Sequence, residues 1–122
     1  MSAQIYQGST KNQIANLETG NLFKGSTANQ IAKIENYAVF QGTTKNQILN
    51  IEGENVYSGS TRNQIARISE GNVYAGSTRN QIASVQNGNI YEGTTKNQIA
   101  SIDGDATNAE MAAILHVVLN VF

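Results

Sequence analysis

The chain has 122 residues, of which 39% are hydrophobic, and this length allows one domain with a modest core. Its net charge of −1, with 14% charged residues, provides no overall field that would attract nucleic acid or an anionic membrane. Cysteine is absent, which excludes disulfide bonds and thiolate zinc sites. We therefore expect a single domain over residues 1–122 that is stabilised by packing and backbone pairing.

The first residues lead directly into a repeated pattern. Residues 1–4 contain neither the basic segment nor the apolar core of a signal peptide. The one strongly apolar stretch, near the C-terminus, is shorter than the roughly 20 residues needed to span a bilayer. We expect a cytoplasmic location by default, without a transmembrane segment and without nucleic acid as a partner.

Six copies of a 17-residue unit occupy residues 4–103. With few departures the unit reads Asn-(Val/Ile/Leu)-(Tyr/Phe)-x-Gly-(Ser/Thr)-Thr-x-Asn-Gln-Ile-Ala-x-(Ile/Leu/Val). Its glycine recurs without insertion or deletion at Gly8, Gly25, Gly42, Gly59, Gly76 and Gly93. Equal spacing indicates that all copies occupy equivalent places in one architecture.

Each copy predicts two strands. In the fourth copy, residues 55–68, two runs rich in β-branched and aromatic residues flank a polar turn at residues 59–63. A second turn follows at residues 69–71. Helix is rejected because glycine recurs in every copy and the apolar residues lack a sustained helical spacing.

Comparison of the six copies predicts which side chains face the core. The positions of Ser58 and Arg67 vary among polar and small residues and are assigned to solvent. Alternation then turns Tyr57, Ala66 and Ile68 inward, with Tyr57 across from Ala66 in a hairpin, and it turns Val56 outward.

Alternation also places the isoleucine that is present in all six copies, Ile65 in the fourth, on the outer face. Two interpretations remain open. A β-bulge rotates this residue inward, or the six isoleucines form an apolar stripe that meets a partner.

The segment after residue 106 predicts a helix. Thr107 and Glu110 have the spacing of a capping box, and we expect the helix to occupy residues 107–121. Within residues 111–122 only His116 and Asn120 are polar, so the helix should be buried on all sides. The alternative is a strand around residues 117–118, which are both valine.

Two architectures satisfy these elements. In one, antiparallel hairpins form a barrel-like closed sheet around the C-terminal helix; in the other, each repeat is one coil of a β-solenoid that the helix caps. A solenoid cap needs only one apolar face, and nothing before the first repeat would protect an open first coil. We therefore expect a mainly β fold of closed hairpins.

The unit Val-Tyr-x-Gly-Ser-Thr-x-x-x-Ile-Ala-x-Ile, followed by an apolar C-terminal helix, resembles tandem short-repeat β proteins of bacteria. The resemblance covers nearly the whole chain. It implies a repeat β fold and supplies no catalytic motif.

Residues that could carry chemistry are sparse. The single histidine, His116, lies in the apolar tail, where a structural role is expected. Residues 103–105, Asp-Gly-Asp, lack most ligands of a calcium loop, and the Gly-Ser-Thr-Lys/Arg step precedes a strand rather than the helix of a phosphate-binding loop. We expect neither an enzyme nor a cofactor or metal site.

Charge placement suggests where a ligand binds. Five copies carry a cation in the turn after the glycine, and the opposite turns collect Glu18, Glu35, Glu52, Glu54, Glu70, Asp103 and Asp105. The closed barrel would thus have one basic and one acidic rim. The candidate binding turns are Thr10, Lys11, Asn12, Thr44, Lys45, Asn46, Thr61, Arg62, Asn63, Thr78, Arg79, Asn80, Thr95, Lys96 and Asn97.

These turns favour a non-catalytic repeat scaffold that acts as a multivalent binding or assembly module, with an anionic or glycan ligand. The alternative is a structural protein that self-associates into a homo-oligomer or filament through its complementary rims. Ice binding by the repeated threonines is less favoured, because a row of charges interrupts the array.

Overall fold

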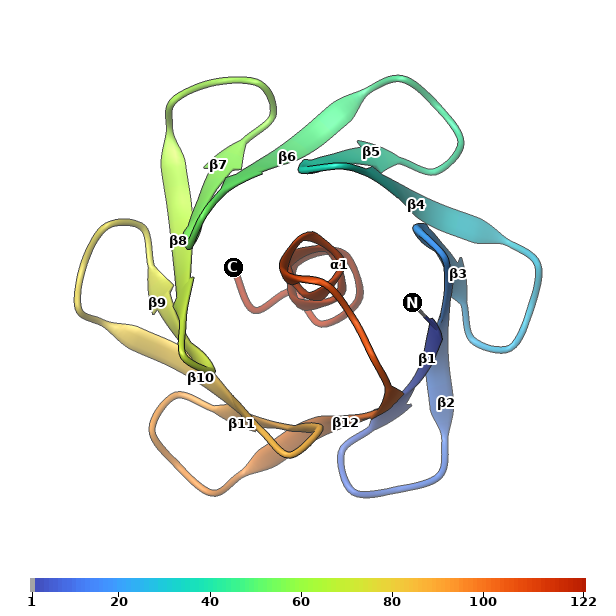
Figure 1. Ribbon diagram of the computed structural model, residues 1–122. Helices are drawn as coiled ribbons and strands as arrows, with labels where there is room; N and C mark the ends of the chain where they lie inside the picture. Colours follow the sequence, from blue (N-terminus) through green and yellow to red (C-terminus); the bar gives the residue numbers. More distant parts are fainter. Residues whose placement is uncertain (1) are drawn as a thin grey trace.

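The computed structural model describes residues 2–122 and shows a closed antiparallel barrel around a C-terminal helix (Figure 1). The strands follow one another around the barrel in chain order, and β1 closes the ring against β12. The strands are β1 (Ser2–Gln7), β2 (Gln13–Glu18), β3 (Asn21–Lys24), β4 (Gln30–Glu35), β5 (Ala38–Gln41), β6 (Gln47–Glu52), β7 (Asn55–Ser58), β8 (Gln64–Ser69), β9 (Asn72–Ala75), β10 (Gln81–Gln86), β11 (Asn89–Glu92) and β12 (Gln98–Gly104). The predicted barrel of hairpins is confirmed, and the solenoid is excluded.

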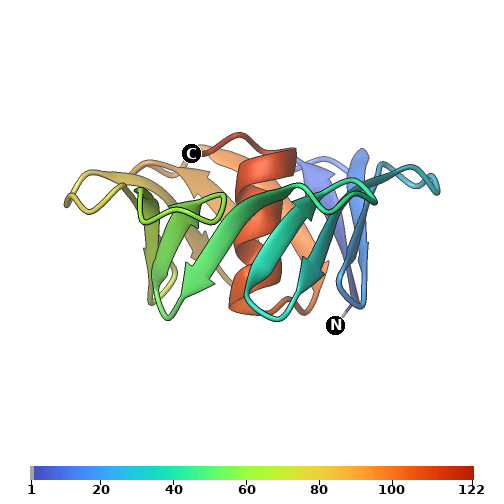
Figure 2. The same cartoon turned by 90° about the horizontal axis from the view of Figure 1, so that it is seen from above.

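Two kinds of connection alternate along the chain and separate the two ends of the barrel. Five-residue loops, such as residues 59–63, join each odd strand to the next even strand, whereas two-residue turns, such as residues 70–71, join each even strand to the next odd one. The long loops spread outward at the end where the chain terminates, and β1 begins at the other end (Figures 1 and 2). We call these the loop end and the turn end.

The C-terminal helix fills the barrel. It comprises α1 (Asn108–Ala113) and a π-helical continuation, η1 (Ile114–Val118). The predicted capping box is present, and the strand alternative for this segment is wrong. The helix ends at Val118 rather than at residue 121, because Asn120 adopts a positive φ of 55° and the Val121 N–H donates to the Leu115 carbonyl.

Glu110 fastens the start of this helix to the barrel wall. Its Oε1 accepts from the Thr107 N–H (2.9 Å), and its Oε2 accepts from the N–H of Gly20 in the β2–β3 turn (3.1 Å). The residue is buried, so both hydrogen bonds are shielded from water. The helix therefore starts at the turn end and runs toward the loop end.

The inner wall differs from the prediction at two positions. Val56 faces the helix and pairs with Ala66, and both are fully buried. Tyr57 lies on the outer surface, half-buried, and pairs with Gln64 instead of Ala66. The predicted inward Tyr57 and outward Val56 are both wrong.

The error has an identifiable origin. The prediction places Ser58 in solvent, and therefore on the outer face, because its equivalents in other copies are polar, among them Lys24 and Glu92. These residues lie at the open loop end, where Lys24 and Glu92 line the mouth of the barrel interior. A polar residue can thus face inward where the barrel opens to water. The interior nearer the turn end instead needs small aliphatic side chains, because a helix about 10 Å across occupies it.

One outer aromatic ring, Tyr74, packs against the neighbouring repeat. Tyr74 pairs across the β8–β9 ladder with Arg67, whose guanidinium lies 4.4 Å from the centre of the ring. A cation over an aromatic face is stabilising. The outward assignment of Arg67 is consistent with this contact.

The interpretation that a β-bulge turns the repeated isoleucine inward is confirmed. In the fourth repeat the register shifts between Val56 and Tyr57, which leaves Ile65 as an extra residue on β8. The same shift recurs in the other five hairpins that hold a long loop. Ile65 is half-buried and packs against the core, so the six isoleucines belong to the barrel interior.

Candidate functional site at the loop end

Threonine gives the long loops their shape. In the fourth repeat Thr61 Oγ1 donates to the Ser58 carbonyl (2.6 Å) and accepts from the Asn63 N–H (3.1 Å). Equivalent pairs form in all six loops. The candidate threonines Thr10, Thr44, Thr61, Thr78 and Thr95 therefore have a structural task, since their hydroxyl protons are already engaged.

The candidate asparagines fall into two groups. Asn12 and Asn46 donate from Nδ2 to the side-chain oxygens of Gln7 and Gln41, and Asn97 donates in the same way to Glu92. Asn63 and Asn80 follow Ser58 and Ala75, which have no side-chain amide or carboxylate oxygen at that position. The loops thus share a backbone shape but differ in the polar groups that they leave free.

A ring of glutamines joins neighbouring loops. The sequence pattern alone does not predict this role. Gln64 Nε2 donates to the carbonyl of Gly76 in the next loop (3.1 Å), and Gln98 closes the ring by donating to Gly8 (2.9 Å). The other repeats form the same bond. The signal in the sequence was the presence of this glutamine in every copy. Its partner lies one repeat further on and is visible only in the fold.

The cations of the candidate turns remain free. Lys11, Lys45, Arg62, Arg79 and Lys96 are all exposed. Within residues 2–122 the one ion pair joins Lys33 and Glu35, so these five side chains have no carboxylate partner in the chain. The ring of long loops therefore presents unpaired positive charge at five of its six positions.

The two ends of the barrel have opposite charge. The loop end carries six cations, the five above and Lys24, against Glu92, whereas the turn end carries the seven acidic residues of the predicted rim. On the wall near the turn end, the Lys33 ammonium lies 2.9 Å from Glu35, and its hydrogen bond and charge lower the pKa of that carboxyl. The predicted separation of charge follows from the alternation of loops and turns.

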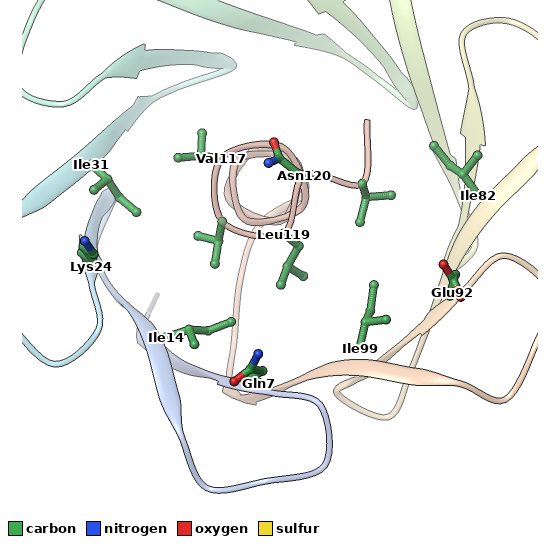
Figure 3. A pocket seen from close by; sticks show the side chains of 12 residues that line it. Gln7, Ile14, Lys24, Ile31, Ile82, Glu92, Ile99, Val117, Leu119 and Asn120 are labelled. Atoms are coloured by element: carbon green, nitrogen blue, oxygen red, sulfur yellow. The ribbon is translucent and has the colours of Figure 1, made fainter.

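An apolar hollow opens at the centre of the loop end. It has a volume of about 720 Å³ and lies between the barrel wall and the last turn of the helix (Figure 3). Ile14, Ile31, Ile82 and Ile99 project from the wall, and residues 117–121 form the inner side. Polar side chains are confined to the rim and the helix end, where Lys24 and Glu92 stand on opposite sides in Figure 3.

The remaining candidate groups have structural contacts. His116 Nδ1 lies 2.7 Å from the Phe122 carbonyl oxygen, and its ring stacks on the Phe122 ring. The backbone N–H of Asp105 donates to the Ser2 carbonyl, which places the predicted Asp-Gly-Asp turn where β12 leads into the helix. Across residues 2–122 no three histidine, cysteine or carboxylate side chains gather as a metal site would require, and no helix is long and apolar enough to cross a membrane.

These features define a class of protein, a closed barrel of β-hairpin repeats that is filled by its own C-terminal helix. A family model described as 6-fold beta flower protein matches residues 5–121, and the chain belongs to this family. The family is not a known family of enzymes, and membership indicates a structural repeat protein. Searches of curated proteins and of solved structures found no match.

Proposed function

We propose that the protein is a non-catalytic binding module whose loop end binds a multivalent anionic ligand, such as an acidic glycan. The observation that carries this proposal is the ring of exposed cations on equivalent loops, none of them paired within residues 2–122. A polymer that presents repeated negative charges can contact several loops at once. Weak contacts then add through effective concentration.

The geometry of the loops supports a rigid array. Each cation is held by a loop whose threonine hydroxyl and glycine are fixed, and the glutamine ring links that loop to the next. A preorganised array loses less conformational entropy on binding than separate flexible loops would. The free groups offered to the ligand are the cations, together with the amides of Asn63 and Asn80.

Binding to heparin tests this function. Alanine is a suitable replacement for the cations, because Ala28 occupies the cation position in the second loop. Replacing Lys11, Lys45, Arg62, Arg79 and Lys96 together by alanine is expected to weaken heparin binding by between about fivefold and about five thousandfold. Conversely, Ala28→Lys completes the ring and should tighten binding by up to about fivefold. Surface plasmon resonance on immobilised heparin measures both.

Lys33→Asn is the matched control, since it removes a cation from the barrel wall and copies Asn16 of the first repeat. It should leave heparin binding unchanged. Equal heparin affinity of the native chain and the five-alanine variant would contradict the proposal.

A second candidate function, head-to-tail self-association, is favoured by the opposite charges of the two ends. The turn end also carries Tyr37, which is 68% exposed and can contact the loop end of another copy. An interface of this kind is heterologous and extends into a filament unless the rotation between copies closes a ring.

Sedimentation velocity at two salt concentrations tests the assembly. At about 0.01 M salt, where charges interact over about 30 Å, the sedimentation coefficient should exceed that at about 1 M salt, where they interact over about 3 Å. Tyr37→Ser removes the exposed ring without adding charge to the acidic end, and it should reduce the association at low salt. A monomer at both salt concentrations is the result that excludes self-association.

A further inference from the structure

The hollow at the loop end leaves hydrocarbon groups facing water. Four of the six isoleucines at the β-bulges form the wall of the hollow. Residues of the helix end, including Val117 and Leu119, lie opposite them. All of these side chains are only half-buried, in contrast to Leu115 one helical turn deeper, which is fully buried. An open apolar concavity of this kind is a recognised mark of a binding site.

The hollow is one-sided, and this follows from how the helix sits. Helix α1 packs against β4, β5 and β6. The hollow lies mainly on the other side, where β1, β2, β3, β10, β11 and β12 line it together with β4, while the equivalent isoleucines Ile48 and Ile65 do not line it. The helix ends at Val118, so no further turn fills the space. Its volume of about 720 Å³ lies within the range of about 300–1,000 Å³ for small-molecule pockets.

The chemistry of the lining selects the ligand. The body of the site offers hydrocarbon, which suits an alkyl chain, while polar groups occur at the rim and helix end, which suits a polar head that stays in water. The loop end carries six cations against Glu92, so the head should be anionic. We infer that the hollow binds the chain of a single-chain anionic amphiphile, with its head beside Lys24. This site is separate from the loop cations proposed to bind a glycan.

Dodecanoate below its micelle concentration is the probe, and isothermal titration calorimetry should show saturable binding of one molecule per chain. Ile99→Asn sets a polar amide in the wall of the hollow and is expected to weaken binding by about tenfold. Ile99→Phe, which keeps the wall apolar but occupies space, should weaken it similarly. The matched control is Ile65→Asn, at the same bulge position outside the hollow, and it should leave the affinity unchanged.

The head-group assignment is tested separately. Lys24→Ser copies Ser58 of the fourth repeat and should weaken dodecanoate binding by about two- to fivefold. Dodecyltrimethylammonium, which has the same chain and a cationic head, should bind native protein more weakly than dodecanoate. Equal affinity for the two head groups would overturn the assignment to Lys24.

Two results would overturn the site itself. One is the absence of dodecanoate binding, or equal losses in Ile99→Asn and Ile65→Asn. The other is a ligand-free oligomer that dodecanoate dissociates, because the occupant would then be a second copy of the chain. Heparin binding by Ile99→Asn should match that of native protein, so failure here is distinguishable from failure of the glycan proposal.

Discussion

Replacing Leu115 by alanine is expected to lower the free energy of unfolding by about 2–5 kcal/mol. The side chain is fully buried where the helix passes through the barrel. Its loss removes contacts and leaves a cavity that the closed wall cannot collapse to fill, because each strand is hydrogen-bonded on both sides. Urea denaturation followed by far-ultraviolet circular dichroism measures the change, with the slope expected to stay constant.

Leu119→Ala is the matched control, since Leu119 is half-buried and faces the hollow. Its loss should cost about 1 kcal/mol or less, because little surface is removed from water and no new closed cavity forms. Equal losses for the two variants would mean that the helix is as tightly packed at its end as inside the barrel. The hollow would then have no physical basis.

The architecture could be predicted because the strand pattern and the apolar C-terminal segment require the same arrangement. Twelve short strands with polar connections need closure to remove their edges, and a C-terminal segment with only His116 and Asn120 as polar residues among residues 111–122 needs cover on every side. A barrel around the helix satisfies both requirements at once. The capping box at Thr107 and Glu110 then fixed the start of the helix.

The orientation of the first strand of each repeat could not be read correctly. Alternation shows which residues of a strand share a face, but the orientation of one residue must be known to decide which face is buried. The polar position of Ser58 is the wrong reference for that decision. In an open barrel, water reaches the inner face at the mouth as well as the outer face. The bulge at Ile65 made this harder, because it breaks the period between the two strands of a hairpin.

The candidate site was only partly predictable for a different reason. The exposure of Lys11 and its equivalents can be predicted from the repeat alone, because a charged side chain in a loop is exposed without needing a contact from another segment. The task of Thr61 in shaping the loop, the glutamine ring and the hollow all depend on atoms from another segment. The hollow in particular exists because the helix ends at Val118.

Gly71→Ala is expected to lower the free energy of unfolding by about 2–5 kcal/mol. Gly71 has a φ of 82°, and a Cβ added there would lie 2.7 Å from the backbone carbonyl oxygen of Val85. The positive φ costs about 1–2 kcal/mol for a residue with a side chain, and the contact forces the next repeat to shift, at about 1–3 kcal/mol more. Thermal and urea unfolding of the variant measure the sum.

Gly53→Ala separates these two contributions. Gly53 also has a positive φ, 61°, but an added Cβ would meet no atom within 4 Å. Both variants gain equally from the reduced entropy of the unfolded chain, so the difference between them isolates the contact with Val85. Gly53→Ala should therefore be the milder change by about 1–3 kcal/mol. Equal costs would show that backbone conformation alone determines the effect.

The repeat also supplies a compensating change. Glu54 occupies the second position of its turn, as Gly71 does, but it lies outside the positive-φ region and follows a glycine at the first position. The double variant Glu70→Gly, Gly71→Glu copies that turn into the β8–β9 connection. It should recover most of the stability that Gly71→Ala loses, because the side chain no longer needs a positive φ beside the Val85 carbonyl. Failure to recover would indicate that each turn depends on contacts particular to its own repeat, and that the six units are less interchangeable than their spacing indicates.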